Sequence, residues 1–119
     1  MKNIAKDLGL KIKVLMRHEI GGQSPSTKTD SIILNLESTK ENGSHWVCIY
    51  KQKYYFDPYG ILPIKNINYE MYNTLQILPD NTKMCGQLCL YILYRIDRGD
   101  SDFSQLILNT KEEMTDLYN

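Results

Sequence analysis

Three side chains of this chain, the thiol of Cys85, the imidazole of His45 and the carboxylate of Asp57, have the chemistry of a nucleophilic centre. A thiol becomes a strong nucleophile once it loses its proton. An imidazole can take that proton, and a carboxylate can orient the imidazole and stabilise its charged form. The same chemistry needs a hydrogen-bond donor for an oxyanion, and the amide of Gln76 is a candidate.

Taken one at a time, these residues have ordinary structural explanations. Most free cysteines are apolar fillers of the core, and Cys85 could be one of them. His45 could be a histidine at the end of a strand, Asp57 a residue of an Asp-Pro turn, and Gln76 a surface amide. A catalytic role therefore depends on whether the fold brings them to one place.

A central helix is predicted to position Cys85, because the apolar residues that follow Cys85 recur with the spacing of one helix face. We expect this helix to start near Asn81 or Thr82, which can cap free backbone N–H groups, since Pro79 disfavours an earlier start. Cys85 then lies in the first turn, where the positive end of the helix dipole favours the thiolate. Gly86 beside it would let a substrate approach closely. The apolar positions are Leu88, Cys89, Ile92, Leu93 and Ile96.

His45 and Asp57 belong to a predicted β-hairpin with strands over residues 44–50 and 54–57. A three-residue turn over 51–53 sets the register and puts both residues on one face, whereas a two-residue turn would separate them. The predicted pairs are Tyr50 with Tyr54, Cys48 with Phe56 and Val47 with Asp57. One face then carries Trp46, Cys48, Tyr50, Tyr54 and Phe56, and the other His45, Val47, Tyr55 and Asp57.

The remaining segments predict an α+β fold, with a small mixed or antiparallel sheet packed on the central helix that carries Cys85 at its N-terminus. The first half is expected to contain a helix at 1–10, a strand or helix at 11–20, a loop at 21–29, a buried strand at 31–36 and a turn at 37–44. The second half is expected to contain a loop or short strand at 61–68, a short helix at 69–75, a buried strand at 75–78, and one or two closing helices at 102–108 and 111–118 with Phe103, Leu106 and Ile107 as packing residues.

Composition limits the classes of function. The 119 residues predict a single domain over 1–119, and 14 basic residues balance 14 acidic ones, which gives no support for nucleic acid or an anionic membrane as the main partner. The odd count of three cysteines, with no signal peptide or membrane span in sight, predicts an intracellular protein in a reducing compartment. We expect no cofactor, and no metal site, since His18 has no ligand at a helpful spacing.

Three short motifs together resemble the adenovirus endopeptidase (adenain) family of cysteine proteases and, more distantly, the Ulp-type SUMO proteases of the same clan. The motifs are Gly-Ser-His-Trp at 43–46, Tyr-Phe-Asp-Pro-Tyr-Gly at 55–60 and Cys-Gly-Gln-Leu-Cys at 85–89. The resemblance covers about residues 2–108, in a chain much shorter than adenain. It implies a minimal version of the adenain/Ulp-like fold.

The resemblance implies a thiol protease in which Cys85 is the nucleophile, His45 the general base and Asp57 the orienting acid. Gln76 would be the oxyanion donor, although it lies further before the cysteine than the family's glutamine does, and Asn81 is a weaker candidate. Trp46 would pack beside the histidine and, with Gly86, border the substrate. A redox role is disfavoured because Cys85 and Cys89 are separated by three residues instead of two.

Enzymes of this kind in small DNA viruses, virophages and Maverick/Polinton-type elements mature capsid proteins, often after Gly-Gly or similar small residues. The resemblance therefore implies a capsid or other virion protein as substrate, in the host cytoplasm, a virus factory or the virion. An activating peptide or DNA would be further partners by resemblance alone. Two alternatives stay open: an isopeptidase that removes ubiquitin-like or SUMO-like proteins, and an inactive protease fold that serves as a binding module.

Overall fold

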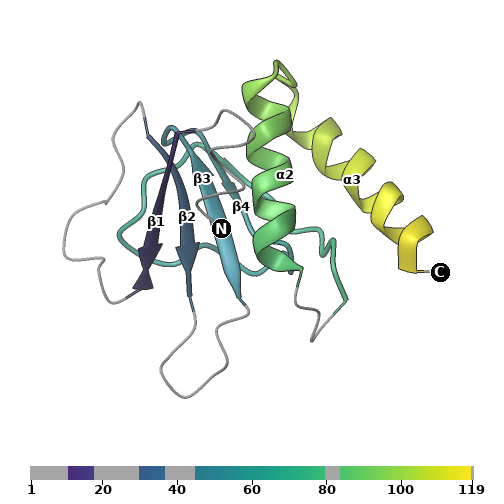
Figure 1. Ribbon diagram of the computed structural model, residues 1–119, viewed down its shortest axis with the longest axis horizontal. Coiled ribbons are helices and arrows are strands. Elements are labelled where there is room, and N and C mark those ends of the chain that lie inside the picture. Colours follow the sequence, from purple (N-terminus) through teal and green to yellow (C-terminus); the bar gives the residue numbers. More distant parts are fainter. Residues whose placement is uncertain (1–10, 18–29, 37–44, 80–83, 119) are drawn as a thin grey trace.

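A five-stranded mixed sheet and two helices make up the part of the chain that the computed structural model describes, residues 11–17, 30–36, 45–79 and 84–118 (Figure 1). The predicted α+β class is confirmed. The strands are β1 (Ile12–Met16), β2 (Ser31–Asn35), β3 (Trp46–Tyr50), β4 (Tyr54–Phe56) and β5 (Met71–Tyr72), and the helices are α2 (Cys85–Asp97) and α3 (Phe103–Tyr118).

The strands lie in sequence order, β1 to β5, across the sheet. The two outer pairs, β1 with β2 and β4 with β5, are parallel, whereas the central strand β3 runs antiparallel to both β2 and β4. The middle strands are the most buried, and β2 and β4 are buried along nearly their whole length. Of the two possibilities for residues 11–20, strand or helix, the structure has a strand, β1, and the predicted strand at 31–36 is β2.

The hairpin of β3 and β4 has the predicted register, with Tyr50 opposite Tyr54 and Cys48 opposite Phe56. The turn contains three residues, and the Lys53 N–H donates to the Tyr50 carbonyl at 2.8 Å. Its first two residues, Lys51 and Gln52, have φ angles of 49° and 58°. This left-handed backbone matches the twist of the two strands.

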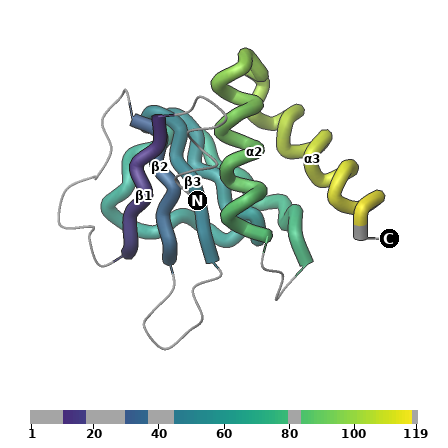
Figure 2. Tube along the Cα trace, in the orientation of Figure 1, coloured from purple at the N-terminus to yellow at the C-terminus, as the bar shows by residue number. Residues whose placement is uncertain are grey.

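Helix α2 packs on the sheet face that carries Cys48, Tyr54 and Phe56, as a helix with one apolar stripe must. The opposite face carries a second buried cluster with Val47, Ile49 and Tyr55. The predicted division of the hairpin into two faces is therefore confirmed at these positions. Figures 1 and 2 show that β3 and α2 run in the same direction and begin at the same edge of the sheet.

Helix α3 is a single helix from Phe103 to Tyr118 and not two separate ones. Phe103, Leu106 and Ile107 are buried, as predicted. The Phe103 ring stacks on the Tyr54 ring with 4.7 Å between centroids, and the Tyr54 hydroxyl donates to the Ser101 carbonyl at 3.3 Å. These contacts fix the start of α3 against the hairpin.

Three predictions of local structure were wrong. The central helix starts at Cys85 and not near residues 81–82, with Met84 at the N-cap and no side-chain cap. The predicted helix at 69–75 is instead strand β5, because the N–H groups of Glu70 and Met71 bond to the Lys53 carbonyl beside β4. Residues 75–78 form no strand, although Ile77 and Leu78 are buried, because their N–H groups both bond to the Pro58 carbonyl.

Several predictions fall on residues outside the described ranges. These are the helix at 1–10, the loop at 21–29, the turn at 37–44, His18 and Asn81.

Candidate active site

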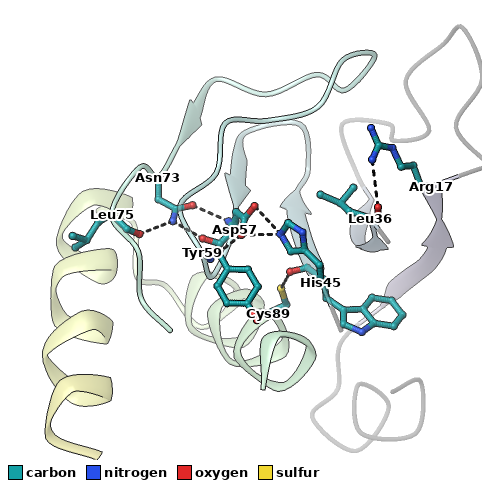
Figure 3. Close-up of polar contacts among 9 residues, drawn as sticks. Arg17, Leu36, His45, Asp57, Tyr59, Asn73, Leu75 and Cys89 are labelled. Atoms are coloured by element: carbon teal, nitrogen blue, oxygen red, sulfur yellow. Dashed lines mark hydrogen bonds and ion pairs between the residues drawn. The ribbon is translucent and has the colours of Figure 1, made fainter. Parts of the chain in front are cut away.

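His45 and Asp57 are in direct hydrogen-bond contact, at the start of β3 and the end of β4 (Figure 3). The His45 Nε2 atom lies 3.1 Å from Asp57 Oδ1 and 3.0 Å from Asp57 Oδ2. The Asp57 side chain is 1% exposed and that of His45 20% exposed. Because His45 directly precedes β3 and Asp57 directly follows β4, the hairpin register is what brings the two together.

The contact through Nε2 decides which ring nitrogen is available for chemistry. A neutral imidazole carries its proton on one nitrogen and a lone pair on the other. A proton held on Nε2 by the Asp57 carboxylate leaves the lone pair on Nδ1. The tilted ring of Tyr59 lies 5.2 Å from the His45 ring between centroids and limits its rotation. His45 is thus oriented to accept a proton at Nδ1.

Asp57 is the first residue of a tight turn that ends at Gly60. The Tyr59 N–H donates to Asp57 Oδ1 at 2.8 Å, and the Gly60 N–H donates to the Asp57 carbonyl at 2.9 Å. Such a turn is what Asp-Pro followed by glycine favours, and Gly60 takes a φ of 69° that glycine adopts without steric cost. The turn directs the carboxylate toward His45.

Asn73 is a residue of this site that the sequence did not indicate. It is 5% exposed, and its Oδ1 accepts the Asp57 N–H at 2.8 Å while its Nδ2 donates to the Asp57 carbonyl at 2.7 Å. Figure 3 shows Asp57 between Asn73 and His45. No local pattern marks Asn73, because its role arises only when its segment crosses the turn that contains Asp57.

Cys85 is the first residue of α2 and is fully buried. One helical turn later, the Cys89 Sγ atom donates to the carbonyl of Trp46, the residue next to His45, at 3.5 Å. Since α2 and β3 begin at the same edge, Cys85 and His45 lie at the same end of the helix–sheet pair (Figure 1). A direct contact between the thiol and the imidazole stays a prediction.

The environment of the thiols distinguishes Cys89 from a nucleophile. Burial, followed by the neighbouring Cys48 thiol, raises the pKa of Cys89 well above its ordinary value. Cys89 therefore stays protonated near neutral pH. Cys85 is equally buried and differs in its place, at the N-terminus of the helix.

The other predicted site residues have varied positions. Trp46 is half-buried and packs against the cluster under α2, and Gly86 is buried in the first turn of that helix. The Gln76 side-chain amide donates to the Leu78 carbonyl at 2.8 Å, so one of its two N–H bonds is engaged locally. Its role as oxyanion donor stays a prediction.

The described ranges contain neither a metal-binding cluster nor a membrane-spanning helix. No three histidine, cysteine, aspartate or glutamate side chains there are grouped so that they could bind a metal ion. Neither α2 nor α3 has the length and apolar character needed to cross a membrane.

The chain was also compared with known proteins. No protein-family model matches it, and no curated protein is significantly similar to it in sequence.

Proposed function

We propose that this chain is a cysteine endopeptidase of the adenain/Ulp-like type that works through Cys85, His45 and Asp57. The observation that carries the proposal is the hydrogen bond of His45 Nε2 with the buried carboxylate of Asp57, at the edge where the helix of Cys85 begins. An imidazole oriented by a carboxylate near a thiol at a helix N-terminus is the arrangement that thiol acyl transfer needs. The sheet with one helix across it fits a minimal version of this fold.

In the proposed mechanism the Nδ1 atom of His45 takes the proton of the Cys85 thiol. The thiolate attacks the carbonyl carbon of the scissile peptide bond and forms a tetrahedral oxyanion, which the backbone N–H of Cys85 at the start of α2 and a side-chain amide stabilise. The imidazolium then gives its proton to the leaving amine, and a thioester to Cys85 remains. Water, deprotonated by His45, attacks the thioester and releases the acid and the thiol.

The proposed substrate is a protein cut after small residues, with capsid or other virion proteins as the preferred setting. Trp46, the residue after His45, is half-buried and packs against the cluster that contains Cys85, and the proposal assigns its bulky indole to the wall of the substrate groove. Peptides with Gly-Gly before the cut should therefore be processed faster than peptides with bulky residues there. Equal rates for both kinds of peptide would contradict this preference.

Replacing the thiol tests the proposed nucleophile. Cys85→Ala should reduce peptide hydrolysis to background and leave the far-ultraviolet circular dichroism spectrum unchanged. Cys89→Ala is the matched control, because it removes another fully buried thiol from the same helix face. It should keep most of the activity. A peptide vinyl sulfone should form a stable thioether with the native chain and with Cys89→Ala, as seen by intact mass, and not with Cys85→Ala.

Hydrolysis that survives in Cys85→Ala, or that is lost equally in Cys89→Ala, would exclude the assignment. Testing a ubiquitin-type or SUMO-type conjugate in the same assay distinguishes an endopeptidase from an isopeptidase.

A second candidate function is a binding module with a protease-like fold. It is favoured by the complete burial of Cys85, since a nucleophile must be reached by the substrate carbonyl. A chain of this kind would bind extended peptides with the same affinity in native and Cys85→Ala forms and would release no product from any of them.

A further inference from the structure

Asn73 holds the backbone of Asp57 on both sides of the residue. Its side-chain oxygen accepts the Asp57 N–H at 2.8 Å, and its side-chain nitrogen donates to the Asp57 carbonyl at 2.7 Å. The same nitrogen donates to the Leu75 carbonyl at 3.1 Å. An amide group thus pairs with Asp57 just as the backbone of a neighbouring strand would, at the point where β4 has ended.

This pairing compensates for a break in the sheet. β4 pairs with β5 through Tyr54 and Tyr55 only, so the ladder stops before Asp57. Asn73 follows β5 directly and continues the pairing with its side chain for one more residue. Because Asp57 is buried, losing the Asn73 bond to its N–H would carry a desolvation penalty, whereas its carbonyl would keep the bond from the Gly60 N–H.

The segment that contains Asn73 holds the same turn at further points. The N–H groups of Ile77 and Leu78 donate to the Pro58 carbonyl at 2.8 and 3.0 Å. A Cβ atom added to Gly60 would lie 2.5 Å from the Thr74 carbonyl oxygen, so the backbones of turn and segment are in close contact. Residues 73–78 therefore act as a support for the turn that contains Asp57.

From this geometry we infer that Asn73 is a positioning residue of the candidate catalytic centre, which acts through Asp57 on the orientation and tautomer of His45. The effect of Asn73 on catalysis rests on the proposed function, whereas its effect on the tautomer of His45 does not. Asn73 touches neither His45 nor the reacting atoms in the contacts described. Its amide fixes the Asp57 backbone, the Tyr59 N–H fixes Oδ1, and the carboxylate then holds the proton of His45 on Nε2.

The first measurement is independent of activity. Long-range proton–nitrogen NMR spectra report which ring nitrogen of a neutral histidine carries the proton. The chain has only two histidines, His18 and His45, so a His45→Gln variant assigns the signals. In the native chain His45 should be protonated at Nε2. In Asn73→Ala, where Asp57 loses both hydrogen bonds to Asn73 and its carbonyl keeps only the bond from the Gly60 N–H, the signals should move toward a mixture of the two tautomers.

The second measurement is kinetic. For Asn73→Ala we expect kcat to fall about 10- to 100-fold with little change in KM, because misplacement of a catalytic group affects the transition state more than substrate binding. Asn73→Ser is the milder variant, since a hydroxyl can bond to one of the two Asp57 backbone groups but cannot bridge both. It should change the tautomer and kcat in the same direction by a smaller amount.

Thr110→Val is the matched control for lost stability. Thr110 is also buried, and its hydroxyl donates to the Leu106 carbonyl at 2.7 Å within α3, away from the hairpin. This variant should lose stability and keep the native tautomer and kcat. Native tautomer and kcat in Asn73→Ala would overturn the inference, as would the same changes in Thr110→Val. A chain without any protease activity would remove the proposed function and leave the tautomer result standing.

Discussion

Asp57 makes hydrogen bonds through its backbone N–H, its carbonyl and its carboxylate. Its N–H and carbonyl bond to Asn73, the carbonyl also accepts from Gly60, and its carboxylate bonds to Tyr59 and His45. A carboxylate held in this way needs no rearrangement when the imidazole beside it becomes charged. The residue thus has the environment expected of an orienting acid.

Asp57→Asn tests the charge of this residue with little change in its size. The amide can still accept from the Tyr59 N–H, but it offers the imidazolium no negative charge. We expect kcat/KM to fall about 100-fold, less than the roughly 10⁴-fold of the serine enzymes, because a thiol gives up its proton more readily than a hydroxyl. Steady-state hydrolysis of a fluorogenic peptide measures the loss.

Asp100→Asn is the control for Asp57→Asn, because it also removes a carboxylate from an ion pair. Asp100 follows the end of α2, and its Oδ2 atom lies 2.6 Å from the Nε atom of Arg95. It should leave hydrolysis unchanged. Full activity in Asp57→Asn would show that this carboxylate is not part of the catalytic centre.

At the residue scale, the sequence predicted the contact of His45 with Asp57 correctly. Strand alternation and a three-residue turn fix which side chains share a face, and both are local properties. The role of Asn73 could not be predicted in the same way. Its partners depend on a loop that returns to the hairpin after leaving it, and loop paths carry no periodic pattern.

At the scale of elements, the turn from Asp57 to Gly60 connects β4 with its support. Gly60 is needed in this turn for two reasons, its φ of 69° and its contact with the Thr74 backbone. Both the strand end and the support therefore determine the position of the carboxylate.

Gly60→Ala should cost about 2–4 kcal/mol in the free energy of unfolding, from left-handed backbone strain together with overpacking against Thr74. It should also lower kcat, since the displaced turn contains Asp57. Urea unfolding and peptide hydrolysis measure the two effects. In Gly99→Ala the φ of 114° gives backbone strain, but no atom lies within 4 Å of the added Cβ.

Gly99→Ala should therefore keep the native kcat and lose less stability than Gly60→Ala. An equal loss of stability in both variants would mean that the contact with Thr74 is relaxed without cost.

Prediction at this scale was correct where an element has one strong apolar pattern, and it failed where contacts with neighbouring segments determine the local structure. Helix α2 follows its stripe of buried positions, whereas its start at Cys85 has no side-chain cap that a sequence could reveal. Strand β5 is only two residues long and largely exposed, so it exists through its bonds to β4 and not through its own propensity.

At the scale of the whole molecule, the core holds titratable groups that favour their neutral forms. Burial raises the pKa of Cys89, and the neighbouring Cys48 thiol raises it further. Burial also raises the pKa of Tyr55, with the Asp57 carboxylate as the next cause. Both groups lie in the tightly packed sheet and helix that carry the candidate site. Their ionisation is linked to unfolding.

The free energy of unfolding should therefore decrease at alkaline pH. An unfolded chain loses the Cys89 proton near its ordinary pKa of about 8.5, while the folded chain retains it to higher pH, so unfolding becomes more favourable as pH rises above that value. Each such group contributes a slope of at most about 1.4 kcal/mol per pH unit, and Tyr55 adds its share from about pH 10. Urea unfolding between pH 7 and 11 follows the decrease.

The Cys89→Ala variant should show a shallower decrease between about pH 8.5 and 10, because it lacks the thiol that ionises on unfolding. An unchanged slope would mean that another group causes the alkaline loss.

The single hairpin that supplies both His45 and Asp57 has a consequence for the order in which the chain folds. Contacts between residues close in sequence form with the smallest loss of chain entropy, so His45 and Asp57 can meet before α2 has been synthesised. Cys85 comes later in the chain, as the first residue of that helix. During translation the proposed proton acceptor can thus be assembled before the proposed nucleophile, and the proposed proteolytic activity would begin only when α2 docks on the sheet.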